Sequence, residues 1–188
     1  MNHKKRVLII SLVVCILIAA VCLLIFIPKN PPVEEQLSFN ERILQENFTG
    51  MTLTIYYADP QVYTRAPLTI QELIERVLDN NSVEFGNVIT IDSKELQENK
   101  DLFKKMIHTE LTPMKDNPTL NARIYLRFDS EKYGKLYDIA MWGLGDNGSN
   151  SIFVCDQPVQ EEDIFYELIV KFAPEVVGYD KVQNYVEK

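Results

Sequence analysis

The stretch Asn121-Ala122-Arg123-Ile124-Tyr125-Leu126-Arg127-Phe128-Asp129 alternates two sets of side chains, with an apolar residue at every second position. Because successive side chains of a β-strand point to opposite faces, this period of two predicts a half-buried strand. The inner face then holds Ala122, Ile124, Leu126 and Phe128, and the outer face holds Arg123, Tyr125 and Arg127. Residues 51–57 alternate in the same way and predict a second strand of this kind.

Further strands are predicted around residues 87–91, 135–143 and 151–155. The turn-rich residues 145–150, Gly-Asp-Asn-Gly-Ser-Asn, separate the last two. Together with the strand at 121–129, these two form an antiparallel meander in the simplest interpretation.

Helices are predicted where apolar residues recur every three or four positions. Thr69 and Glu72 precede such a pattern at the spacing of a capping box, in which each side chain accepts a hydrogen bond from the backbone of the other. Similar apolar stripes predict helices over about residues 94–111 and 159–173. Strands and helices in this order favour an α+β domain with the helices on one face of the sheet.

Residues 7–27 form an apolar stretch that only Ser11 interrupts. As a helix, its 21 residues would extend about 31 Å, against a hydrocarbon core of about 30 Å, so we expect a transmembrane helix. A cleaved secretory signal would have a shorter apolar core of about 7 to 15 residues. A lipoprotein signal modified at Cys22 would need a small residue where Val21 stands, and a buried core helix would show an amphipathic face.

The expected fold class is therefore α+β: one N-terminal transmembrane helix, followed by a domain with a mostly antiparallel sheet of about five strands and three to four helices. Basic residues at positions 4–6 predict a cytoplasmic N-terminus. We expect a cytoplasmic tail at 1–6, the membrane helix at 7–27, a stalk or juxtamembrane helix at 28–50, and an extracytoplasmic domain at 51–188. The cell membrane is thus the predicted location.

The charge of the chain argues against nucleic acid as a partner. All 27 acidic residues follow Ile27, whereas four of the 19 basic residues lie at or before Lys29. Nucleic-acid binding depends on a basic surface that neutralises phosphates, which this acidic domain does not offer.

No catalytic residue, cofactor or metal is expected. His108 is the one histidine after the apolar stretch, and no motif around it supplies the partners of a nucleophilic triad. Residues 146–150 concentrate oxygen-bearing side chains but lack the spacing of an EF-hand loop. Cys155 is the one cysteine outside residues 7–27, so we expect a small apolar strand residue, with an intermolecular disulfide as the alternative.

The outer faces of the strands offer a candidate binding surface. Tyr, Arg and Trp are enriched at binding hot spots because they combine contact area with directed polar groups. The predicted ligand- or partner-binding residues are Arg123, Tyr125, Arg127, Tyr56, Trp142 and Arg65. An acidic ligand or a protein partner would suit the arginines, although cross-strand acids could pair with Arg123 and Arg127 instead.

Several segments together resemble a family of small membrane-anchored proteins of Gram-positive Firmicutes. They are Lys4-Lys5-Arg6, the apolar stretch, Met51 to Tyr57, Arg65-Ala66-Pro67-Leu68-Thr69, Asn121-Ala122-Arg123-Ile124-Tyr125 and Ile164-Phe165-Tyr166-Glu167. The resemblance covers most of the chain. It implies a bacterial source and an extracytoplasmic domain, and it implies no activity and no site residues.

Three functional hypotheses remain open from the sequence. The first is a membrane-anchored extracytoplasmic binding or interaction module. The second is an envelope hydrolase, which would need two carboxylates that face each other in a pocket, about 5 to 9 Å apart. The third is a structural subunit of a membrane complex.

Overall fold

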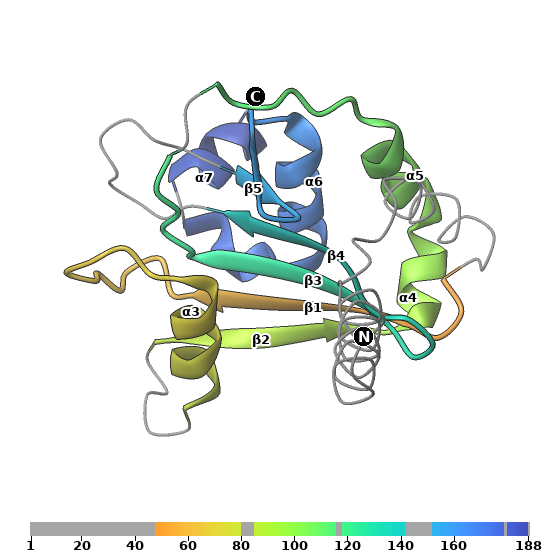
Figure 1. Ribbon diagram of the computed structural model, residues 1–188, viewed down its shortest axis with the longest axis horizontal. Helices are drawn as coiled ribbons and strands as arrows, with labels where there is room; N and C mark the ends of the chain where they lie inside the picture. The colour runs from red at the N-terminus through yellow and green to blue at the C-terminus, as the bar shows by residue number, and fades with distance from the viewer. Residues whose placement is uncertain (1–47, 80–84, 116–117, 142–151, 179, 188) are drawn as a thin grey trace, which may run out of the picture. The chain divides into compact units, whose positions relative to one another are not determined.

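The computed structural model describes residues 48–79, 85–115, 118–141, 152–178 and 180–187, all within one compact unit formed by residues 39–188. A six-stranded sheet organises them, in the order β2-β1-β3-β4-β5-β6, and every neighbouring pair is antiparallel (Figure 1). The strands are β1 (Met51–Ala58), β2 (Gly86–Ile91), β3 (Ile124–Ser130), β4 (Gly134–Met141), β5 (Ile152–Val154) and β6 (Gln157–Val159). The helices are α3 (Ile70–Leu78), α4 (Ser93–Glu98), α5 (Lys100–His108), α6 (Asp163–Phe172), the 3-10 helix η1 (Pro174–Gly178) and α7 (Asp180–Val186).

The larger core lies on the face of the sheet that α6 and α7 cover, behind the strands in Figure 1. Phe103 of α5 lies near its centre. Its ring centroid is 5.3 Å from that of Phe48, 5.8 Å from that of Phe128 and 5.5 Å from that of Phe172. The Phe103 ring of α5 therefore packs against β3, against α6 and against the segment that leads into β1.

The opposite face of the sheet carries a smaller core under α3, in front of the strands in Figure 1. Leu73 of α3 is fully buried there, together with Tyr125 of β3 and Ala140 of β4. The predicted capping box is confirmed, because the Thr69 side chain accepts from the Glu72 N–H at 3.1 Å and Glu72 accepts from the Thr69 N–H at 2.8 Å. Helices thus cover both faces of the sheet, and the expectation of one covered face is wrong.

The fold class expected from the sequence needs correction in two respects. The sheet has six strands rather than about five, because the short hairpin of β5 and β6 extends the predicted meander by one strand. In addition, no helix within the described part of the chain combines the length and the apolar character needed to cross a membrane. The helix predicted at 7–27 and residues 28–47 of the stalk predicted at 28–50 lie outside the described residues.

Two helix boundaries also differ from the predictions. The helix expected over 94–111 is two helices, α4 and α5, which meet at Asn99, where the side-chain amide donates to the Glu95 carbonyl oxygen at 2.8 Å. Asparagine competes for backbone hydrogen bonds in this way and so interrupts helices. The helix expected over 159–173 begins only at Asp163, because Val159 belongs to β6.

The strand faces follow the predicted alternation. Along β1, Met51, Leu53, Ile55 and Tyr57 are buried, and the residues between them are half-buried. At the start of β2, Gly86 permits a close approach of the backbone, since a Cβ atom there would lie 2.0 Å from the Tyr57 carbonyl oxygen. The pairing of β1 with β2 then continues without a bulge to Ile91.

Candidate functional site

The loop between β1 and α3, residues 59–69, extends beyond the end of the sheet in Figure 1. Tyr63 lies on this loop with 84% of its surface exposed, and Arg65 is also exposed. A tyrosine this exposed is unusual, because most aromatic side chains are stabilised by burial of the ring and this ring is not buried. We call residues 59–69 the display loop.

The chain just before β3 holds both ends of the display loop. At its start, the Ala58 N–H donates to the Arg123 carbonyl oxygen at 2.8 Å. At its end, the Leu68 N–H donates to Asn121 Oδ1 at 2.9 Å, and the Ala122 N–H donates to the Leu68 carbonyl oxygen at 2.8 Å. Three consecutive residues therefore fix where the loop leaves the sheet and where it enters α3.

The guanidinium group of Arg123 holds the middle of the display loop. It donates to the carbonyl oxygen of Val62, to that of Asp59 at 3.4 Å and to Thr64 Oγ1 at 3.5 Å. Arg123 is only 4% exposed, and its Nε has no hydrogen-bond partner among the described residues. Within the described ranges no carboxylate pairs with it, so the loop backbone supplies the solvation that a buried charge requires.

A tight turn shapes the first part of the display loop. The Val62 N–H donates to the Asp59 carbonyl oxygen at 3.0 Å, and the Gln61 N–H donates to Asp59 Oδ1 at 2.7 Å. Proline at the second position of such a turn fixes its φ angle near the value that the turn needs. An aspartate at the first position accepts a hydrogen bond from a backbone N–H two residues later. Asp59-Pro60 thus forms a turn whose carbonyl groups face Arg123.

A second group of polar side chains lies on the sheet face that α3 partly covers. Tyr125 donates its hydroxyl to Asp138 Oδ2 at 2.9 Å, and Lys135 Nζ donates to the same oxygen at 2.8 Å. Asp138 is 4% exposed, and its Oδ1 has no partner among the described residues. The aspartate therefore ties β3 to β4 through one oxygen.

Arg127 and Asp129 form a neighbouring pair on the same strand. Arg127 Nε and the Asp129 carboxylate approach to 2.8 Å, and Arg127 also donates through its terminal nitrogen at 2.8 Å. Both side chains are partly exposed, so the pair lies at the surface and its contribution to stability is small. Arg127 is thus neutralised by an acid of its own strand, and not by the cross-strand acid that the sequence alternative expected.

The titratable groups around Asp138 are not prepared for catalysis. Burial raises the pKa of the Tyr125 hydroxyl, and the hydrogen bond to Asp138 raises it further. The hydrogen bond to Asp138 also raises the pKa of Lys135, and burial raises the pKa of the Cys155 thiol. At neutral pH, Tyr125 and Cys155 therefore stay neutral and Lys135 stays charged, which leaves no activated nucleophile among these groups.

Cys155 occupies a tight hairpin turn. Cys155 and Asp156 both have positive φ angles, 47° and 65°, and they join β5 to β6 directly. Two consecutive positive φ angles are the signature of a type I′ turn. Cys155 is thus a turn residue and not, as predicted, a strand residue, although it is half-buried and packs against the larger core.

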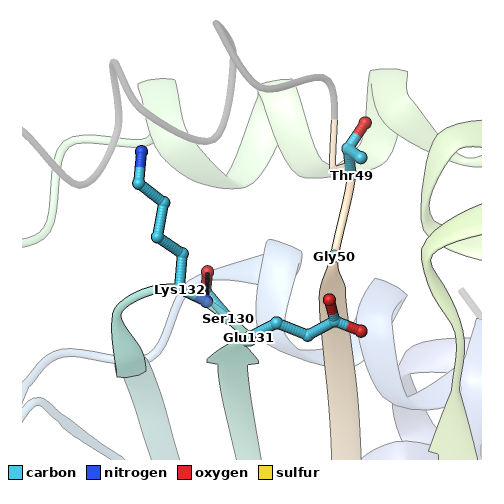
Figure 2. A pocket seen from close by; sticks show the side chains of 5 residues that line it. All are labelled: Thr49, Gly50, Ser130, Glu131 and Lys132. Atoms are coloured by element: carbon cyan, nitrogen blue, oxygen red, sulfur yellow. Dashed lines mark hydrogen bonds between the residues drawn. The ribbon is translucent and has the colours of Figure 1, made fainter.

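An open pocket lies at the far end of the sheet, where the chain enters β1 and β3 turns into β4. Figure 2 shows its lining, which consists of Thr49, Gly50, Ser130, Glu131 and Lys132, around a volume of about 380 Å³. The Glu131 N–H donates to the Gly50 carbonyl oxygen at 2.9 Å, which joins the two segments that line the pocket. Among the described residues that line it, Glu131 is the one acid, so they do not supply the carboxylate pair of the hydrolase hypothesis.

The structure does not combine the residues predicted to bind a ligand into one open surface. Arg123 and Tyr125 are each 4% exposed, so the expectation that they form an open surface is wrong. Tyr56 is half-buried with its ring centroid 6.1 Å from that of Tyr125, and Arg127 is paired with Asp129. Arg65 is exposed on the display loop, and Trp142 lies outside the described residues.

Tyr63 and Asp138 were missed as site residues. An aromatic residue in a loop rich in turn-forming residues was the available signal for Tyr63, since such a residue has no strand or helix face to bury it. Asp138 gave no signal in the sequence, because its burial depends on the pairing of β4 with β3.

No group of three or more His, Cys, Asp or Glu side chains suited to a metal ion occurs in the described ranges. Comparisons of the chain with protein-family models, with curated proteins and with solved structures found no match. The resemblance to membrane-anchored proteins of Firmicutes therefore stays a prediction.

Replacing Tyr125 with Phe removes one of the two donors to a buried carboxylate. We expect the free energy of unfolding to fall by about 1 to 3 kcal/mol at pH 7, as measured by urea denaturation. The folded state holds the Tyr125 proton more tightly than the unfolded state, so this stabilisation is present below the unfolded pKa of about 10 and is lost above it. Wild-type stability should thus decline more steeply above pH 10 than that of Tyr125→Phe.

The matched control is Tyr56→Phe, which removes a hydroxyl from the half-buried ring beside Tyr125. Its stability should stay within about 0.5 kcal/mol of the wild type. Equal losses from the two substitutions would show that the bond to Asp138 contributes nothing specific.

Proposed function

We propose that this domain is a binding module that recognises a protein partner through the display loop. The observation that carries the proposal is Tyr63, 84% exposed on a loop whose backbone is held from beneath by the buried Arg123. An exposed aromatic side chain on a fixed loop suits recognition, because little conformational entropy is lost when the partner binds.

The composition of the display loop supports a protein partner. Tyrosine and arginine are among the residue types enriched at energetic hot spots, and Tyr63 and Arg65 are two positions apart on the loop. Arg65 offers a fork of donors that fits a carboxylate of the partner. An acidic side chain beside an apolar contact for the tyrosine ring is therefore the expected counterpart.

The polar group around Asp138 supports binding rather than catalysis. Its proton donors, Tyr125 and Lys135, both donate to the buried Asp138, and the thiol beside them has a raised pKa. We therefore infer that Tyr125, Lys135 and Asp138 stabilise the sheet.

The direct experiment places a photo-crosslinking amino acid, p-benzoylphenylalanine, at position 63 of the full chain in the native cells. We expect a discrete cross-linked product that Arg65→Ala reduces roughly fivefold or more, as for a hot-spot contact. Position 133 is the matched control, because Tyr133 is also exposed but lies at the turn between β3 and β4, at the other end of the sheet. Identical products from positions 63 and 133, or none from 63, would overturn the proposal.

We also propose that the domain is held at the outer surface of a cell membrane by the apolar residues 7–27. The support is the length of that stretch and the basic residues before it. Alkaline phosphatase fused after Lys188 should be active in a bacterial host, and the full chain should stay in the membrane fraction after alkaline carbonate washing. An inactive fusion or release by carbonate would contradict this location.

A further inference from the structure

The two edges of the sheet are protected very differently. At the β6 edge, residues 112–114 pair with the strand, and Val159 forms a β-bridge with Pro113. The Met114 N–H donates to the Pro158 carbonyl oxygen at 3.0 Å, and the Gln160 N–H donates to the Thr112 carbonyl oxygen at 2.9 Å. β6 also contains a proline and is three residues long. The β2 edge is six residues long, has no proline, lysine or bulge, and pairs with no other strand among the described residues. Natural sheets usually block such an edge.

The hydrogen bonds show which backbone groups of β2 face outward. The Asp59 N–H donates to the Phe85 carbonyl oxygen at 2.8 Å, so the facing residues Ala58 and Gly86 form a non-hydrogen-bonded pair. Because the two kinds of pair alternate along an antiparallel ladder, Val88 and Thr90 belong to pairs of the same kind. Their N–H and C=O groups therefore point away from β1.

The side chain of Asn87 confirms this direction. Asn87 Oδ1 accepts the Val88 N–H at 2.8 Å, which is the bond expected where that N–H has no partner on β1. The side chains along the edge suit a further strand, since Val88 and Ile89 are half-buried and Thr90 is exposed. Residues with branched Cβ atoms pack well against neighbours in a sheet.

We propose that the outer edge of β2 accepts an extended, basic segment of a partner protein as a seventh antiparallel strand. Backbone pairing of this kind gives affinity, and the alternating side chains give specificity. The charge argues for a basic segment, because the chain has a formal net charge of −8 and Asp92 lies exposed at the end of β2. A second copy of the chain would bring the same negative charge and be repelled. The site is separate from Tyr63 and does not depend on the function of the display loop.

The test uses the peptide Lys-Val-Thr-Val-Thr-Val-Lys, blocked at both ends, added to the ¹⁵N-labelled full chain in detergent micelles. We expect saturable shifts of the Gly86, Val88 and Thr90 amide signals. The same peptide with Glu in place of both Lys should bind at least tenfold more weakly. Asn87→Ala should bind more tightly than the wild type, because the competing side chain is gone.

Two variants separate backbone pairing from side-chain contacts. Val88→Pro removes an outward N–H without removing a ladder bond, so the fold should persist and affinity should fall at least tenfold. Val88→Thr keeps the N–H and should bind within twofold of the wild type. If Val88→Pro does not fold, Thr90→Pro makes the same test at the next outward position. Absent shifts in the wild type, or equal binding by a folded proline variant, would overturn the proposal.

Discussion

A buried positive charge constrains this domain more than any other interaction. Removing a guanidinium group from water costs several kcal/mol, and within the described ranges Arg123 recovers this through carbonyl and hydroxyl oxygens of the display loop. A hydrogen bond of normal length from a charged donor is worth roughly 1.5 to 3 kcal/mol, and the bonds to Asp59 and Thr64, at 3.4 and 3.5 Å, are worth less than the shorter bond to Val62. The loop and the arginine therefore depend on each other: without the loop the charge is unsolvated, and without the charge the loop loses its support.

The position of Arg123 explains why this dependence reaches the whole sheet. Its backbone N–H donates to Met141 of β4 at 2.8 Å, and its carbonyl oxygen accepts from Ala58 at the end of β1. The same residue thus joins the sheet to the loop. On the adjoining sheet surface, Tyr125 and Lys135 both donate to the buried Asp138, so β3 and β4 are fixed together beside the loop.

Sequence patterns predicted the local elements well and their surroundings poorly. The alternation along β1 and the capping box at Thr69 depend on neighbours in the chain, and the structure confirms both. The same alternation placed Arg123 and Tyr125 on the outer side of their strand, but a period of two cannot show that α3 and the display loop cover that side. β6 was missed because three residues that include Pro158 give no periodic signal.

The most direct measurement of the central claim is amide hydrogen exchange of the full chain with Arg123 replaced by Met. The account predicts that exchange of the Gln61 and Val62 amides, which the turn at Asp59 protects, becomes at least tenfold faster, while the amides of β1 and α6 keep their protection. Arg123→Lys keeps a charge but not the fork of donors, so its loop amides should exchange at a rate between those of the wild type and of Arg123→Met. Unchanged exchange in the display loop of a folded Arg123→Met variant would show that the loop is held in some other way, and would contradict the account.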